Sequence, residues 1–94
     1  MESGSTSRVV LPYQLRDRSG GARSVELHGN TVRELLDDLD ARWPGLKFSI
    51  CHETGELRPF VNVFVGPEDI RYLAGLDTAV NGQTVHIIHS VAGG

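Results

Sequence analysis

Residues 31–43 carry the clearest local pattern in the chain, that of a single amphipathic helix. Thr31 and Glu34 have the spacing of a capping box, in which a threonine hydroxyl and a glutamate carboxylate accept hydrogen bonds from free amides at a helix start. Pro44-Gly45 stops the helix just after Trp43. Between these signals one apolar stripe recurs at the helical period: Val32, Leu35, Leu36 and Leu39. A chain with one such helix must bury this stripe against another element.

The segment before the helix has the residues of a β-hairpin. Arg8–Leu15 is the first apolar stretch, and Pro12 places this strand at an edge or a bulge because proline cannot donate to a ladder. Asp17–Gly21 has turn residues, with two glycines that can take positive φ. Arg23–His28 then alternates between apolar and polar residues, as a half-buried strand does. We expect this strand to pair with the first.

The segment after the helix has further strand patterns. A loop over residues 45–59, with a short helical turn at Phe48–His52, precedes a β-branched and aromatic strand at Phe60–Val65, which we expect to be central. Residues 70–73 are predicted to form a short strand and residues 76–80 a loop. The Asn81-Gly82 pair is a strong turn signal, and it introduces the last predicted strand, Thr84–His89.

The order of these elements predicts the fold class. Ninety-four residues suffice for one domain, and strands on both sides of one helix favour an α+β roll, with the helix across one sheet face. A right-handed crossover places the first and last strands centrally and parallel. The sheet is therefore predicted to be mixed, with four to five strands packed on one long helix. We expect residues 8–90 to form this domain, between a disordered segment 1–7 and a flexible tail 91–94.

Charge and cysteine content exclude several functions. Twelve acidic and nine basic side chains leave a net charge of −3, without the basic stripe that nucleic-acid binding requires. The single cysteine, Cys51, rules out an internal disulfide and a cysteine-based zinc cage. No apolar run approaches the roughly 20 residues that span a bilayer, and residues 1–8 lack the apolar core of a signal peptide. We therefore expect a cytoplasmic protein that contacts neither nucleic acid nor membrane.

No residue pattern points strongly to catalysis or to metal binding. Cys51 and His52 are adjacent, so they are not expected to face each other as nucleophile and base. His86 and His89 are three apart on a strand and so face opposite sides of the sheet. No glycine-rich loop follows a strand and opens a helix, so nucleotide binding has no support. The acidic residues of the helix are interpreted as a solvated face: Glu34, Asp37, Asp38 and Asp40.

The chain ends in Val91-Ala92-Gly93-Gly94, which places two residues without side chains beside the α-carboxylate. A frayed end is one interpretation. The other is a tail that threads into the active site of another protein, because only glycine lets enclosing walls approach the main chain so closely. The reacting group would then be the Gly94 carboxylate, activated by that other protein. A terminal Gly-Gly together with a β-β-α-β-β order indicates such a threading tail more specifically than either feature alone.

After residue 7 the sequence resembles the β-grasp, ubiquitin-like sulfur carriers of the MoaD/ThiS type, and among them the carriers of actinobacterial cysteine biosynthesis. Family members have the same helix after the first hairpin and the same Gly-Gly end. The likeness is strongest in four stretches: Arg58–Val65, Glu68–Arg71, Val85–Ile88 and Val91–Gly94.

The resemblance implies a sulfur cycle at Gly94 in which the chain is not itself an enzyme and binds no cofactor. An E1-like adenylyltransferase and sulfurtransferase would use ATP and magnesium to convert the Gly94 carboxylate to an acyl-adenylate. A sulfur donor would then displace AMP and leave a covalent 1-thioglycine, a thiocarboxylate. The implied acceptor is a biosynthetic enzyme, such as a PLP-dependent cysteine synthase or a thiazole-synthase-like enzyme, and a metallopeptidase that trims the tail is a further partner. Cysteine, thiamine, molybdopterin and sulfur-containing secondary metabolites all stay open as products.

The sulfur-carrier interpretation also predicts docking residues, and two rival functions stay open. Val91, Ala92 and Gly93 would enter partner active sites. Three apolar residues are candidates for docking on the sheet face away from the helix, or else belong to the core: Phe60, Phe64 and Ile88. One rival function is a ubiquitin-like modifier that is conjugated to lysines through Gly94, although a single lysine, Lys47, argues against self-linked chains. Another is an interaction module in which Gly-Gly has no role.

Overall fold

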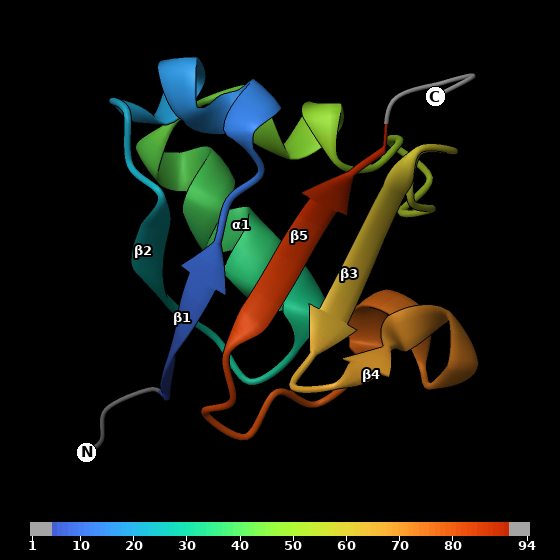
Figure 1. Ribbon diagram of the computed structural model, residues 1–94. Coiled ribbons are helices and arrows are strands. Elements are labelled where there is room, and N and C mark those ends of the chain that lie inside the picture. The colour runs from blue at the N-terminus through green and yellow to red at the C-terminus, as the bar shows by residue number, and fades with distance from the viewer. Residues whose placement is uncertain (1–4, 91–94) are drawn as a thin grey trace.

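The computed structural model describes residues 5–90, which form a five-stranded mixed sheet with one α-helix across one face (Figure 1). The helix α1 spans Val32–Arg42, and the strands lie in the order β2-β1-β5-β3-β4. This arrangement is the predicted α+β roll. The strands are β1 (Thr6–Val10), β2 (Ser24–His28), β3 (Val61–Val65), β4 (Glu68–Asp69) and β5 (Val85–His89).

The first and last strands lie side by side at the centre of the sheet, as predicted. β1 pairs with β5 in parallel, with Val9 opposite Val85, and β3 pairs with β5 antiparallel. The strand β3 is therefore internal, next to the central β5 and flanked by the short β4. Because β1 and β5 are parallel, both end at the same end of the sheet, and the antiparallel β3 begins there. We call this the tail end, since the last strand, β5, finishes there (Figure 1).

The helix α1 begins and ends where the sequence predicts. The Thr31 hydroxyl accepts a hydrogen bond from the Glu34 amide at 3.2 Å. The Glu34 carboxylate accepts one at 2.6 Å from the amide of Asn30, one residue before the position that a standard capping box uses. The helix ends at Arg42, and Trp43 packs against the core. The four stripe residues are each at most 1% exposed: Val32, Leu35, Leu36 and Leu39.

The core lies between this stripe and the inner face of the sheet. Successive strand residues point to opposite faces, so every second residue faces α1. The pattern is clear in β3, where the three valines are buried and the two residues between them are half-buried. The buried inner-face residues are Val9, Leu27, Val61, Val63, Val65, Val85 and Ile87.

The first strand differs from the prediction at both ends. It begins at Thr6, and Ser7 is fully buried, so placing residues 6 and 7 in a disordered segment was wrong. It ends at Val10 rather than at residue 15, and Pro12 caps a 3₁₀ helix, Tyr13–Ser19. Proline has no amide hydrogen for a ladder, and its fixed φ suits a helix start.

Two short segments also differ from the prediction. The helical turn in the 45–59 loop is a 3₁₀ helix at Leu46–Ser49, earlier than the expected Phe48–His52. The short strand is β4, Glu68–Asp69, and residues 70–72 form a 3₁₀ turn instead. The Asp69 carboxylate accepts a hydrogen bond from the Arg71 amide at 2.8 Å and so favours the turn over an extended chain.

The turn before β5 is confirmed. Asn81 and Gly82 both have positive φ, 49° and 76°, which is the backbone that an Asn-Gly pair tolerates well. Within residues 5–90, no helix has the length and apolarity to cross a membrane.

Candidate docking surface at the tail end

The main chain at the end of β5 is tied to the segment before β3. The Ser90 amide donates to the carbonyl oxygen of Phe60 at 2.7 Å, which continues the β5–β3 ladder by one bond. Ser90 is the last described residue, so the predicted tail of Val91, Ala92, Gly93 and Gly94 lies outside the described part. Its point of departure is therefore fixed relative to the sheet.

Two of the three predicted docking residues, Phe64 and Ile88, lie on the sheet face away from α1. Ile88 is two residues before Ser90, whereas Phe64 lies near the other end of β3. Phe60 comes just before β3 and accepts the hydrogen bond from the Ser90 amide. In the register of β3 and β5, Asn62 lies opposite Ile88 and Phe64 opposite His86, and all four alternate with the buried inner-face residues. Phe60 is 46% exposed and Ile88 47%, while Phe64 is half-buried. None of the three belongs to the core cluster. Together Phe60, Phe64 and Ile88 form what we call the apolar patch.

Arg71 lies at the edge of this patch and was not predicted as a site residue. Its guanidinium donates to the side-chain oxygen of Asn62 and, at 2.8 Å, to the carbonyl of Val61. The residue therefore reaches from the turn after β4 to the start of β3. A planar cation beside exposed apolar side chains can bind a carboxylate or a carbonyl of a partner.

Further arginines surround the tail end. Each of four arginines donates to a main-chain carbonyl: Arg16 to Leu11, Arg18 to Gly45, Arg58 to Phe48 and Arg71 to Val61. Among residues 5–90, none of the four is within ion-pair distance of a carboxylate. No carboxylate of the described residues neutralises these four guanidinium groups, although the whole chain carries a net charge of −3.

Cys51 does not have the environment of a nucleophile. The side chain is fully buried, deeper than the partly buried loop position that we expected, and Sγ lies 3.7 Å from the carbonyl oxygen of Lys47. Burial raises the pKa of the Cys51 thiol, so the reactive thiolate is disfavoured. The two strand histidines lie on different faces, as predicted: His86 is exposed, and the half-buried His89 shares the register of the inner-face residues.

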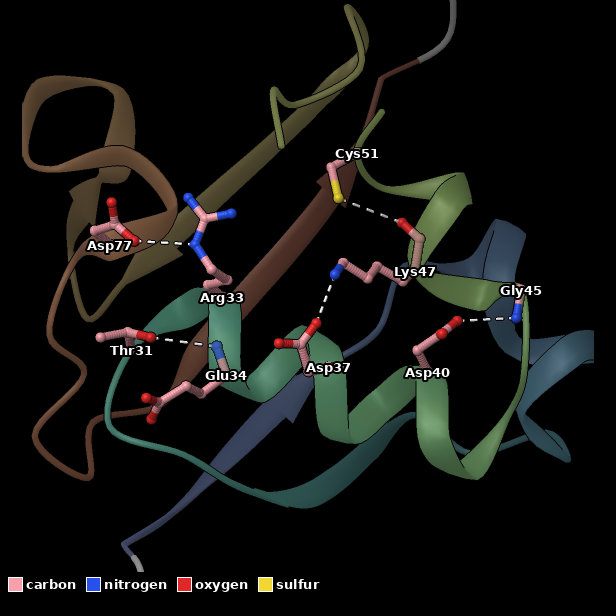
Figure 2. Close-up of polar contacts among 9 residues, drawn as sticks. All are labelled: Thr31, Arg33, Glu34, Asp37, Asp40, Gly45, Lys47, Cys51 and Asp77. Carbon is pink, nitrogen blue, oxygen red and sulfur yellow. Dashed lines mark hydrogen bonds and ion pairs between the residues drawn. The ribbon is translucent and has the colours of Figure 1, made fainter. Parts of the chain in front are cut away.

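The acidic residues of α1 are not the purely solvated face that was predicted, because each accepts a hydrogen bond from a residue outside the helix. Figure 2 shows the contacts of Asp37 and Asp40. Asp37 pairs with Lys47 at 2.5 Å, and Asp40 accepts from the Gly45 amide at 2.9 Å. Asp38 accepts from the His28 amide at 2.8 Å, and this bond is the main reason that the pKa of Asp38 lies below its usual value. These carboxylates join α1 to β2 and to the loop after the helix.

Comparison with known proteins identifies the family. Residues 9–94 match the ThiS family. The sulfur carrier protein CysO of Mycobacterium tuberculosis is 38% identical over 89 residues, which cover 92% of this chain and 96% of the relative.

The chain belongs to the ThiS family.

Solved structures of similar proteins agree with this assignment. The crystal structure of the BexX/CysO complex from Amycolatopsis orientalis matches with a TM-score of 0.86 and 42% identity, covering 94% of this chain and 99% of the matched chain. The small archaeal modifier protein SAMP1 of Methanosarcina acetivorans matches with a TM-score of 0.79 and 28% identity, covering 99% and 100%. The roll described above is thus the ubiquitin-like β-grasp fold that the sequence resemblance implied. Members of the ThiS family include carriers like CysO, so the tail end of this member is the surface to examine for function.

Proposed function

We propose that this ThiS-family chain is a sulfur carrier whose Gly94 carboxylate is converted to a thiocarboxylate, and that it is not itself an enzyme. The observation that carries the proposal is the Val91–Gly94 tail, which follows β5 directly on a domain similar to CysO along nearly its whole length. In support, the buried, protonated Cys51 is poorly suited to act as a catalytic nucleophile. A carrier of this kind needs its chemistry to be supplied by a partner.

The carboxylate must be activated before it accepts sulfur. In the proposed first step, a Gly94 carboxylate oxygen attacks the α-phosphorus of ATP, pyrophosphate leaves, and an acyl-adenylate forms in the magnesium-containing active site of an E1-like enzyme. In the second step, a donor of sulfide-level sulfur such as hydrosulfide attacks the acyl carbon, AMP leaves with the bonding electron pair, and loss of the S–H proton leaves a thiocarboxylate. A carboxylate is a poor electrophile, whereas a mixed anhydride with AMP has a good leaving group. Tethering the sulfur to a protein raises its effective concentration at the acceptor.

The geometry of the tail end supports docking of such an enzyme there. Phe64 and Ile88 of the apolar patch lie on the open sheet face, and a hydrogen bond holds Ser90, the last described residue, against Phe60. Arg71 adds a positive charge beside the patch, through its contacts with Asn62 and the Val61 carbonyl. CysO of Amycolatopsis orientalis forms a complex with BexX, and we infer that this chain also acts through a complex with a partner protein.

The likeness to CysO favours a cytoplasmic biosynthetic enzyme as the sulfur acceptor. A PLP-dependent cysteine synthase is the first candidate, and a metallopeptidase that trims a spent tail would complete the cycle. Conjugation of Gly94 to lysines of other proteins is the second candidate function, and the structural similarity to the archaeal modifier SAMP1 favours it. The acyl-adenylate is common to both functions, and only the attacking nucleophile differs.

Deleting Gly94 tests the proposal. The deletion leaves a glycine carboxylate at Gly93 but draws it back by about 3.5 Å. An active site that fixes the reacting carbon should lose orders of magnitude in rate from this displacement, while the described fold, which ends at Ser90, should melt as the full chain does. The measurement is ATP-dependent pyrophosphate release with the cognate activating enzyme, followed by mass detection of one oxygen exchanged for sulfur. If the deleted chain gains sulfur at the full rate, Gly94 is not the carrying residue.

A further inference from the structure

Lys47, the one lysine of the chain, is folded back onto α1. It lies in the 3₁₀ helix Leu46–Ser49, and its Nζ lies 2.5 Å from Oδ1 of Asp37 (Figure 2). Only 23% of its side chain is exposed, against 57% for Asp37. The other eight cationic residues are arginines, whose guanidinium groups do not deprotonate in proteins. Lys47 is therefore the only side chain here that can supply an amine nucleophile.

The contact with Asp37 keeps this amine in its unreactive form. An ammonium ion has no free electron pair, so only the neutral amine attacks an acyl carbon. The hydrogen bond that Lys47 donates to Asp37 is the main cause of a raised Lys47 pKa, and partial burial opposes it only in part. The contact also directs Nζ toward the helix surface, as Figure 2 shows, rather than into solvent. An acylating group would have to break the ion pair before it met the amine.

A reactive amine would compete with the sulfur donor for an activated C-terminus. This inference therefore rests on the proposed function, in which Gly94 is activated. If a lysine attacks the Gly94 acyl-adenylate, the nitrogen–carbon bond forms, AMP leaves with its electron pair, and the amine loses a proton. The product is an isopeptide, within one chain or between two chains, and the carboxylate can no longer accept sulfur. Lys47 lies at the tail end, where α1 and β5 both finish (Figure 1). The amine therefore lies at the end of the sheet where the described chain finishes, four residues before Gly94.

We propose that Asp37 determines the specificity of acyl transfer: by holding the Lys47 ammonium against α1, it withholds the one side-chain amine from the activated Gly94, so that the acyl group passes to the sulfur donor and not to the carrier itself. Asp37 acts here through Lys47 and is a positioning residue. The ion pair lies away from the apolar patch, which is on the opposite face of the sheet from α1.

Three variants separate this role from a general effect on folding. Asp37→Asn frees the amine. Asp77→Asn is the matched control. It breaks an exposed ion pair between Asp77 and Arg33 of α1, whose Oδ1 and Nε atoms lie 3.0 Å apart, and it releases a guanidinium rather than an amine. The double variant Asp37→Asn with Lys47→Arg removes the amine. All three change exposed or partly exposed side chains, so we expect them to fold, which circular dichroism checks.

The first measurement needs no partner enzyme. Each folded chain is treated with a small amount of an N-hydroxysuccinimide ester of acetate, together with a short unstructured peptide that contains one lysine as an internal standard, and peptide mass spectrometry follows acetylation of Lys47. We expect Asp37→Asn to raise the acetylation rate about two- to fivefold, the range expected of a partly exposed ion pair, and Asp77→Asn to leave it unchanged. Equal rates in the wild type and in Asp37→Asn would overturn the proposal.

The second measurement uses the cognate activating enzyme with ATP and without a sulfur donor. We expect Asp37→Asn to accumulate isopeptide products, seen as chains or dimers that have lost one water, and the wild type and the double variant to form none. The same isopeptide yield in the wild type and in Asp37→Asn overturns the proposal. If no variant and no wild-type chain releases pyrophosphate, the proposed function fails, and the acetylation rates still decide whether Asp37 withholds the amine.

Discussion

Replacing Phe60 by alanine tests whether the apolar patch is the docking surface. A phenylalanine side chain presents about 200 Å², so the 46% that is exposed leaves roughly 90 Å² to be buried by a partner. At about 25 cal/mol per Å² this burial contributes about 2 kcal/mol, which is about 30-fold in affinity. The variant keeps the main-chain carbonyl of residue 60, which accepts a hydrogen bond from the Ser90 amide. Ser90 should therefore stay in place.

The assay is pyrophosphate release by the cognate activating enzyme at varied carrier concentration. We expect the KM of Phe60→Ala to rise about 30-fold, in line with the affinity estimate, with kcat nearly unchanged, because the side chain contributes binding and no chemistry. Leu73→Ala is the matched control: Leu73 is 45% exposed but contacts the groove beside Val65 and Pro67, at the opposite end of β3. An unchanged kcat/KM for Phe60→Ala, or an equal loss for Leu73→Ala, would refute the assignment of the patch.

Two further predictions concern stability. Leu36 is 1% exposed, so Leu36→Ala should lower the free energy of unfolding by about 2–5 kcal/mol. The melting temperature should fall by at least about 8 °C. If the variant melts like the wild type, the helix stripe has been assigned to the wrong face. The pKa of Asp38 is lowered by the His28 amide, so its contribution to stability is present above its ordinary value of 3.8 and is lost as the pH falls through the folded-state pKa. Asp38→Asn should therefore flatten the acid side of a plot of unfolding free energy against pH, and an unchanged slope there would contradict the role of this bond.

The elements that sequence could predict are those that local chemistry dictates. The Thr31 cap, the four-residue stripe of α1 and the Asn81-Gly82 turn each depend on residues a few positions apart. The parallel pairing of β1 with β5 followed from the handedness of one crossover. The 3₁₀ helix Tyr13–Ser19 could not be predicted in this way, because Leu15, which is 4% exposed, is an apolar residue that suits a buried strand or a buried turn equally well.

The same limit applies to the site. Alternation in β3 and β5 sufficed to place Phe64 and Ile88 on the open face. The position of Arg71 depends on contacts with Val61 and Asn62, ten and nine residues away, and Arg71 itself lies in a turn that was predicted as a strand. The ion pair of Lys47 with Asp37 likewise joins a 3₁₀ helix to α1 across the end of the helix. A periodic sequence pattern predicts which face of a helix or strand a residue occupies. It does not predict which residue of another segment will contact that residue.

The most direct test of the sulfur-carrier function is the intact mass of the protein purified from its native host, with fragmentation to locate any change. We predict a population that is heavier by the exchange of one oxygen for one sulfur, with the change confined to Gly94. The same species should form in vitro from the purified chain, its activating enzyme, ATP with magnesium, and a sulfur donor. If both samples contain only the unmodified carboxylate although adenylation proceeds, the result contradicts a sulfur carrier and favours conjugation through Gly94.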